Sequence, residues 1–433
     1  MSSTATMTPP LSTDKRVRLS IMMFLQFAVW GAWYVVFYPY LIRRGFTDQQ
    51  AGALMGTMAL GAIFSMLFVG SLADRFFSSE RIMAVCHLVG AGLLYLMAQI
   101  QEPSQFWTLF AVALAYALLY NPTLALANAV TFTHVPDGTR DFPGIRVLGT
   151  IGWIVVCFLI DRLFIRKVMG AEGVVEELPA SATNGPLLLA AGISAVLGVY
   201  CLFLPHTPPT GKQGDAIPFL KALDLFKDYS FAVFFTVSFV ITIVLAFYFT
   251  STANFLEKGV GVTNVGTTML IGQIAELILL PLLPLFLWRF GMKWVLAVGM
   301  LAWGIRYALF ALGGPTGLPF ALVILGVALH GVCFDFFFAA GFIHVDNEAP
   351  RDIRASGQSL YSFLNYGVGM WLGNMLAGYV AAWCTDPETG TVDWTKFWMV
   401  PSIGVLLSLA VFLVFFHTHV PGEQGQARDR KAA

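Results

Sequence analysis

RIMAVCHLVGAGLLYLM, residues 81–97, and KWVLAVGMLAWGIRYALF, residues 293–310, are two versions of one apolar pattern. Each version begins with a basic residue, and each is about as long as the roughly 20-residue helix that crosses the hydrocarbon core of a bilayer. Their positions correspond, because each is the third apolar run in its half of the chain. The repeat therefore predicts two related halves built from membrane-spanning helices.

A second repeated segment supports this division. TFTHVPDGTRDFPGIR, from Thr131, and GFIHVDNEAPRDIR, from Gly341, each contain His-Val and close with Ile-Arg, and each joins the fourth and fifth apolar runs of its half. Parallel repeats related by an axis along the membrane normal are typical of transporters that hold their solute between the two halves at mid-membrane.

The composition agrees with a membrane protein, since 57% of the 433 residues are hydrophobic and only 12% are charged. The mean hydropathy of +0.73 is far above that of an average soluble domain. Twelve apolar windows are long enough to cross a bilayer. They are residues 19–41, 50–73, 82–100, 106–131, 144–164 and 186–204 in the first half and 229–254, 265–288, 293–313, 318–343, 356–380 and 396–417 in the second.

We expect an all-α polytopic membrane protein, in which 12 transmembrane helices form two pseudo-symmetric six-helix bundles. The expected units are an N-terminal tail (1–18), an N-terminal bundle (19–204), a linker containing Pro208 and Pro209 (205–228), a C-terminal bundle (229–417) and a C-terminal tail (418–433). In this topology seventeen of the 25 Lys and Arg residues lie on the side of the two tails and seven on the other, while Arg306 lies inside a span. The positive-inside rule therefore predicts that both tails and the linker are cytoplasmic.

Several other classes of protein find little support. The formal net charge is zero, so no basic surface suggests a nucleic-acid partner. The five cysteines lack CxxC spacing, so we expect neither a disulfide framework nor a metal site. The chain contains no P-loop, HExxH or GxSxG motif of an enzyme, and neither half supplies the re-entrant filter of a channel. We expect no cofactor.

The segment GSLADR, residues 70–75, ends the second window and begins the loop after it, and Arg81 follows. This segment resembles the signature loop of the major facilitator superfamily, and the resemblance implies the major facilitator fold. Asp74 and Arg75 would then form a cytoplasmic gate, in which charges beside helix termini hold the two halves together in one state. The alternative is a solvated loop that only obeys the positive-inside rule.

Ionisable groups inside membrane spans are costly and are candidates for function. Gln273 and Glu276 lie three residues apart, and so on one face of the eighth span. The apolar surroundings of Glu276 suit reversible protonation, because desolvation favours the neutral acid. The tenth span contains His330, Phe334 and Asp335.

The other embedded charges are Arg146, one turn before Thr150 on the fifth span, and Arg306 on the ninth. Two carboxylates and two arginines suggest pairing that a solute or a proton could rearrange. The alternative is that these charges only hold helices together, and we favour it for Arg306 because the ninth helix is normally peripheral in this architecture. We likewise expect His87 to be a packing residue.

Aromatic residues are abundant, among them Trp30, Trp33, Trp153 and residues 247–249. Most aromatics in a membrane protein pack or form interfacial belts, but a few lining a cavity would suit a planar ring such as a nucleobase. Gly52, Gly56 and Gly61 indicate points of close helix packing.

Six stretches show a specific resemblance over almost the whole chain. They are FLQFAVWGAW from Phe24, GSLADRFFSSE from Gly70, DFPGIRVLGTIGW from Asp141, GQIAE from Gly272, HGVCFDFF from His330 and IRASGQ from Ile353. With these stretches the chain resembles the nucleoside:proton symporter family of the major facilitator superfamily. The resemblance implies proton-driven uptake of nucleosides across the cytoplasmic (inner) membrane by a protein that works as a monomer.

The resemblance also implies that six residues line the substrate cavity: Arg146, Thr150, Gln273, Glu276, Phe334 and Asp335. We add Trp153, Phe249 and His330 as candidate substrate-binding residues. Glu276 and Asp335 would couple transport to protons. Three positions depart from the family pattern. Phe249 lies in an aromatic stretch where other members have amide side chains, His330 replaces an aromatic residue, and Trp153 replaces phenylalanine. A transporter of another small solute, such as a sugar or an aromatic metabolite, is therefore the alternative.

Overall fold

The structure of the chain is a computed structural model that describes residues 10–76, 78–169, 175–209, 218–350 and 353–417. Side chains at 66–76, 139, 218–221 and 355 lie outside the described part.

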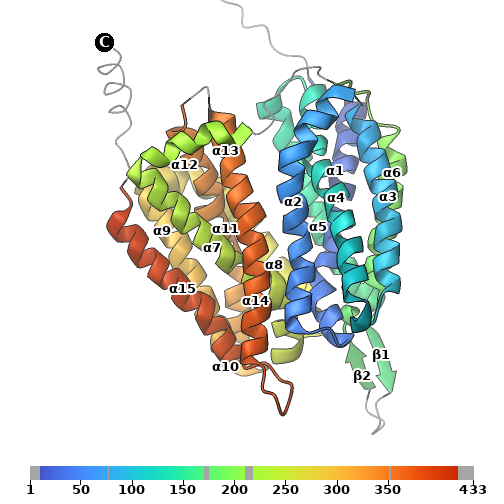
Figure 1. Cartoon of the computed structure of the whole chain (residues 1–433), viewed down its shortest axis with the longest axis vertical. Coiled ribbons are helices and arrows are strands. Elements are labelled where there is room, and N and C mark those ends of the chain that lie inside the picture. The colour runs from blue at the N-terminus through green and yellow to red at the C-terminus, as the bar shows by residue number, and fades with distance from the viewer. Residues whose placement is uncertain (1–9, 77, 170–174, 210–217, 351–352, 418–433) are drawn as a thin grey trace, which may run out of the picture.

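The first half forms six long helices and one small hairpin. The helices are α1 (Thr13–Arg43), α2 (Asp48–Phe76), α3 (Ser79–Gln99), α4 (Phe106–His134), α5 (Gly138–Phe164) and α6 (Gly185–Cys201), with short 3-10 turns at Pro103–Gln105 and Ala180–Ala182. Strands β1 (Arg166–Met169) and β2 (Val175–Leu178) pair antiparallel between α5 and α6. They project from one end of the molecule, which we call the hairpin end (Figure 1). This hairpin was not predicted from the sequence.

The second half is more broken. Its helices are α7 (Tyr229–Asn254), α8 (Val265–Leu279), α9 (Leu283–Ala311), α10 (Gly317–Ala328), α11 (His330–Phe334), α12 (Ala340–Glu348), α13 (Arg354–Ser362), α14 (Met370–Cys384) and α15 (Trp394–Phe415). It also contains 3-10 segments at Pro218–Lys227 and Leu280–Leu282. Three π-helical turns occur at Phe255–Gly259, Asp335–Ala339 and Phe363–Gly369.

These elements group into twelve spans within the described residues. The segment α9 contains Gly291 with φ 76° and ψ 166°, a left-handed conformation that favours glycine, and the eighth span ends there. The segments α10, α11 and α12 run on as the tenth span through the turn at Asp335–Ala339, and α13 and α14 form the eleventh. In the part of the chain that the structure describes, eight stretches are long and apolar enough to cross a membrane, and one of them, Val265–Ala311, holds two spans. The twelve predicted windows thus agree with the structure.

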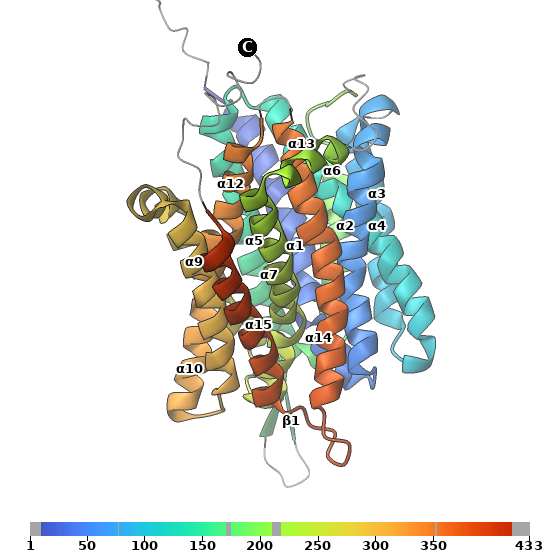
Figure 2. The same ribbon diagram turned by 60° about the vertical axis from the view of Figure 1, so that its left-hand side comes forward.

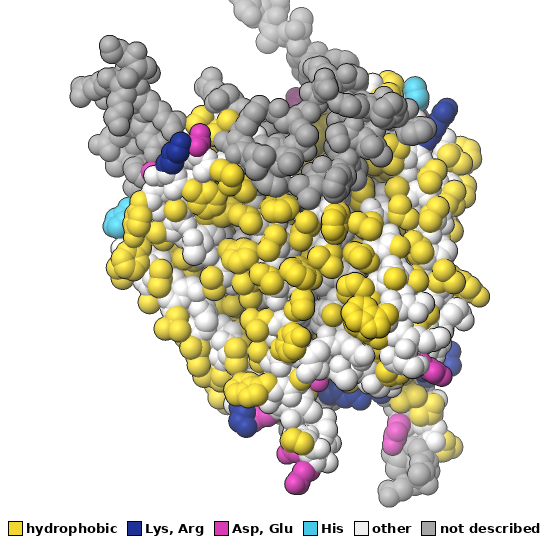
Figure 3. All heavy atoms as spheres, in the orientation of Figure 1, with side chains coloured by type: hydrophobic (Ala, Val, Ile, Leu, Met, Phe, Trp, Pro, Cys, Tyr) yellow, Lys and Arg dark blue, Asp and Glu magenta, His cyan; other side chains and the backbone are white. Residues whose placement is uncertain are grey.

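The spans form two bundles that lie side by side, α1–α6 in one and α7–α15 in the other (Figures 1 and 2). Each bundle has its own hydrophobic core. A small third cluster of Val35, Cys157 and Leu270 joins residues from both bundles. On the face seen in Figure 3, hydrophobic side chains cover a broad middle band, and the charged side chains in view gather toward its two ends. This pattern fits a protein that spans a bilayer.

At the hairpin end the bundles are tied by buried carboxylates. Glu257, after α7, accepts a hydrogen bond from Nε of Arg43 at 2.5 Å and another from the hydroxyl of Ser181. Asp161, near the end of α5, accepts from the backbone amides of Gly266 at 3.3 Å and Thr267 at 2.6 Å, in the first turn of α8. Asp161 therefore caps a helix of the opposite bundle.

Close backbone contact between α2 and α14 also holds the two bundles together at the hairpin end. A Cβ atom on Gly52 would lie 2.6 Å from the carbonyl oxygen of Asn374, and one on Gly378 would lie 2.5 Å from that of Asp48. Between the side chains that the structure describes, the inter-bundle hydrogen bonds and ion pairs lie at the hairpin end. The structure therefore represents a state closed at that end.

Candidate functional site

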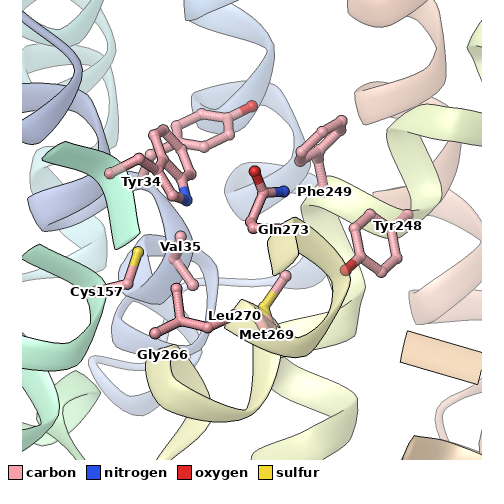
Figure 4. A pocket seen from close by; sticks show the side chains of 10 residues that line it. Tyr34, Val35, Cys157, Tyr248, Phe249, Gly266, Met269, Leu270 and Gln273 are labelled. Carbon is pink, nitrogen blue, oxygen red and sulfur yellow. The ribbon is translucent and has the colours of Figure 1, made fainter. Parts of the chain in front are cut away.

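A pocket lies between the two bundles, just inside the contacts of the hairpin end (Figure 4). Helices α1 and α5 form one side and α7 and α8 the other. The lining residues are Tyr34, Val35, Trp153, Cys157, Tyr248, Phe249, Gly266, Met269, Leu270 and Gln273. Because both bundles contribute walls, any movement of one bundle against the other changes the pocket.

The wall from the first bundle is aromatic. Trp153 meets Trp30 edge to face, with ring centroids 5.4 Å apart and planes at 89°. The ring centroid of Trp30 in turn lies 5.7 Å from that of Tyr34 and 6.2 Å from that of Tyr120. These contacts support Trp153 and Tyr34, the two rings of this group that line the pocket, so that a solute can contact an aromatic ring there.

Helix α8 supplies the polar residues of the second bundle. Gln273 lines the pocket, and Glu276 follows one turn later with a side chain that is 22% exposed. Glu276 interacts electrostatically with Arg146 of α5, and the Arg146 guanidinium lies 4.2 Å above the ring of Phe27. The charged groups of α5 and α8 thus face each other across the boundary between the bundles.

The tenth span brings a histidine and a second carboxylate to the same place. Nε2 of His330 lies 3.7 Å from Oε2 of Glu276, and the ring of His330 stacks on Tyr248 with centroids 5.1 Å apart. Asp335 opens the π-helical turn and is 1% exposed, and it interacts electrostatically with Glu276. Neither of its carboxylate oxygens has a hydrogen-bond partner among the described residues. π-helical turns are rare and occur often at functional sites.

The structure brings most of the predicted site residues together. Three of them line the pocket, namely Trp153, Phe249 and Gln273. Four more form the adjoining charged cluster, namely Arg146, Glu276, His330 and Asp335. The other two, Thr150 and Phe334, are half-buried, and the ring of Phe334 lies 5.7 Å from that of His330. The roles of all nine stay predictions.

Other predictions have different outcomes. Asp74 and Arg75 lie in the last turn of α2, and not in the loop that was predicted. Their side chains lie outside the described residues, so the gate stays a prediction. His87 is buried in the first bundle with Nε2 2.9 Å from Oε1 of Gln26, as expected for a packing residue. Tyr34 and Met269 also line the pocket, although they were not predicted to, since nothing in an apolar run marks which face lines a cavity.

Comparison with known proteins places the chain in a family. A family model described as "Nucleoside H+ symporter" matches residues 13–420. The chain belongs to this nucleoside H+ symporter family. Its members are transporters and not enzymes.

Relatives of this symporter agree in sequence and fold. It is 39% identical to YegT of Escherichia coli (strain K12), covering 92% of this chain and 93% of that one. It is 32% identical to the xanthosine permease of Escherichia coli (strain K12), covering 94% and 97%. The crystal structure of the nucleoside transporter NupG superimposes with a TM-score of 0.83 at 28% identity, covering 94% of this chain and all of that one. The symporter therefore has the major facilitator fold.

Proposed function

We propose that this symporter takes up nucleosides together with protons across the cytoplasmic (inner) membrane by alternating access. Both termini lie in the cytoplasm, the protein works as a monomer, and the proton gradient drives transport without a cofactor. The hairpin end then faces outward. The contacts of Arg43, Asp161 and Glu257 close the outward path in the present state.

The observation that carries the proposal is the pair of carboxylates beside the aromatic pocket. Glu276 and Asp335 interact with each other and lie on different spans of one bundle, and Glu276 also interacts with Arg146 of the other bundle. Two negative charges in one buried site repel, and a proton on either relieves the repulsion. The protonation state of the pair therefore alters the attraction between the bundles.

The remaining residues have roles that follow from their chemistry. Trp153 and Phe249 offer ring faces on which a nucleobase can stack. Gln273 can donate and accept hydrogen bonds at the pocket wall, and Arg146 and Thr150 extend this polar surface. Asp74 and Arg75 act as the gate at the opposite end.

The test is uptake of radiolabelled uridine and adenosine into proteoliposomes, with and without an imposed inward proton gradient. We expect accumulation that depends on the gradient. Glu276→Gln and Asp335→Asn should lose accumulation but retain exchange of labelled for unlabelled nucleoside, since exchange does not require the unloaded carrier to return. Accumulation of uridine by Glu276→Gln against a gradient would exclude the coupling role of that carboxyl group.

One observation favours a second candidate, a transporter of another small aromatic solute. The α7 wall of the pocket consists of Tyr248 and Phe249, which bear no amide group. Competition by unlabelled nucleosides, sugars and aromatic metabolites separates the candidates. Lack of competition by any nucleoside would keep the transporter and overturn the substrate.

A further inference from the structure

Arg306 of α9 is a buried charge with no carboxylate partner among the described residues. It is 0% exposed, and its guanidinium carbon lies 3.4 Å from the centroid of the Tyr248 ring. Trp303 and Phe310 are also within cation–π range, at 5.2 and 5.6 Å. Nε and Nη2 of Arg306 form no hydrogen bond within the described part of the chain. An apolar side chain would fill this place at lower cost, so the charge points to a role beyond packing.

The one hydrogen bond that this guanidinium forms within the described residues determines which ring nitrogen of His330 carries a proton. Nη1 of Arg306 lies 3.1 Å from Nδ1 of His330. A guanidinium only donates hydrogen bonds, so Nδ1 must be the acceptor and must carry no proton. The ring proton of His330 is therefore on Nε2, and the imidazole is neutral.

The ring orientation directs this proton toward the site. Nε2 lies on the edge that faces Glu276, 3.7 Å from Oε2, which is longer than a hydrogen bond. Tyr248 stacks on the imidazole at 5.1 Å, and Phe249 meets it edge to face at 6.3 Å and 88°. The N–H group is thus held next to the carboxylate of Glu276 but does not form a hydrogen bond with it.

We propose that Arg306 is a positioning residue that fixes the Nε2–H tautomer of His330, so that His330 presents one hydrogen-bond donor to the solute. The inference rests on the proposed function of this site. The matching group on the solute is a hydrogen-bond acceptor, such as a carbonyl oxygen or ring nitrogen of a nucleobase. His330 does not carry the transported proton, which leaves that task to Glu276 and Asp335.

The surroundings of the imidazole support this assignment. The titratable or charged groups that interact with His330 or lie beside it are Arg306, Glu276, Tyr248, Cys333 and Asp335. Arg306 is the one cation among them in the described residues, and its N–H group donates to Nδ1. The neutral ring with its proton on Nε2 is therefore the form of His330 that this hydrogen bond requires.

The direct test is nitrogen-15 NMR of histidine in the full-length protein in nanodiscs. The signals of His330 are identified by their loss in His330→Gln. We expect the wild type to show an unprotonated Nδ1 and a protonated Nε2. Arg306→Met should give a mixture of tautomers or a charged ring, while Arg306→Lys, which keeps a cationic donor, should stay close to the wild type. A proton on Nδ1 in the wild type, or no change in Arg306→Met, would overturn the inference.

Transport kinetics provide a second readout. Loss of one positioned hydrogen bond should raise the KM of Arg306→Met for its preferred nucleoside about tenfold, with a smaller change in maximal rate. His330→Gln, which keeps an N–H donor, should retain more affinity than His330→Phe. Equal affinity of these two variants would contradict a donor role.

Failure of the proposed function and failure of this inference can be distinguished. If no nucleoside is transported by the wild type, the proposed function fails, while the NMR result still decides the tautomer. If Arg306→Met does not fold, as judged by gel filtration, Arg306→Lys and the two His330 variants still test the donor.

Discussion

Replacing Asp161 by asparagine should weaken the closure of the hairpin end. The carboxylate is 4% exposed and accepts hydrogen bonds from two backbone amides of the opposite bundle, at 3.3 and 2.6 Å. Hydrogen bonds to a charged group contribute about 1.5–3 kcal/mol each. The asparagine side chain keeps one acceptor oxygen but loses the second bond and the attraction to the helix terminus. We expect a loss of about 2 kcal/mol, which shifts the equilibrium about 30-fold toward the state that is open at this end.

The native Cys157 is a built-in reporter of this shift. It lies one turn before Asp161, lines the pocket and is 1% exposed. A maleimide that cannot cross the bilayer, applied from the hairpin side, should modify Cys157 faster in Asp161→Asn than in the wild type. A Cys157→Ser background identifies the signal from this cysteine. Asp346→Asn is a matched control, because it removes an aspartate that is half exposed and pairs at 3.5 Å with Arg354 of the same bundle.

An unchanged labelling rate in Asp161→Asn would refute the reasoning, provided that the protein remains folded. Equal acceleration by Asp346→Asn would also refute it, because the effect would then not depend on the cap.

Three further predictions concern the same end of the molecule. Glu257→Gln should open it as well, since Arg43 keeps its charge without its partner, and the double variant with Arg43→Gln should restore part of the closure in the same labelling assay. Gly378→Val should abolish accumulation but preserve solute binding from the hairpin side. The new Cβ would lie 2.5 Å from the backbone of Asp48 and would block the approach of α14 to α2. Transport by this variant equal to that of the wild type would contradict the close-contact argument. Asp393 caps α15 outside the membrane, and the hydrogen bond from the backbone amide of Lys396 holds the pKa of this carboxyl below its usual range. Asp393→Ala should therefore lower the melting temperature in detergent at neutral pH by the equivalent of at most about 1 kcal/mol. This difference should vanish as the pH falls through the lowered pKa and the wild-type carboxyl becomes protonated; a difference that persists in acid would show that the cap does not cause it.

The sequence was sufficient to predict the twelve spans, because burial in lipid demands long apolar runs and the two halves repeat the same order. It also predicted that Gln273 and Glu276 share a face of one helix, since helical periodicity alone determines this. The boundary at Gly291 was located within a few residues, because a basic, glycine-containing segment cannot continue an apolar span.

Other features depend on contacts between distant parts of the chain. The interpretation of Arg306 as a structural charge rested on the peripheral place of the ninth helix, but its side chain reaches inward to His330. The cap that Asp161 gives to α8 joins residues about a hundred positions apart, and no local pattern marks it. Nor does a pattern show that β1 and β2 pair, because each strand has only four residues.

The three π-helical turns all lie in the second half of the described chain, at Phe255–Gly259, Asp335–Ala339 and Phe363–Gly369. A π-helical turn lengthens the hydrogen-bonded ring by one residue, and it is one of the identifiable sites at which a long helix bends. The two bundles therefore depart from regular helix in different ways. The first has prolines inside α1, α4 and α5, whereas the second adds π-helical turns, one of which carries Asp335.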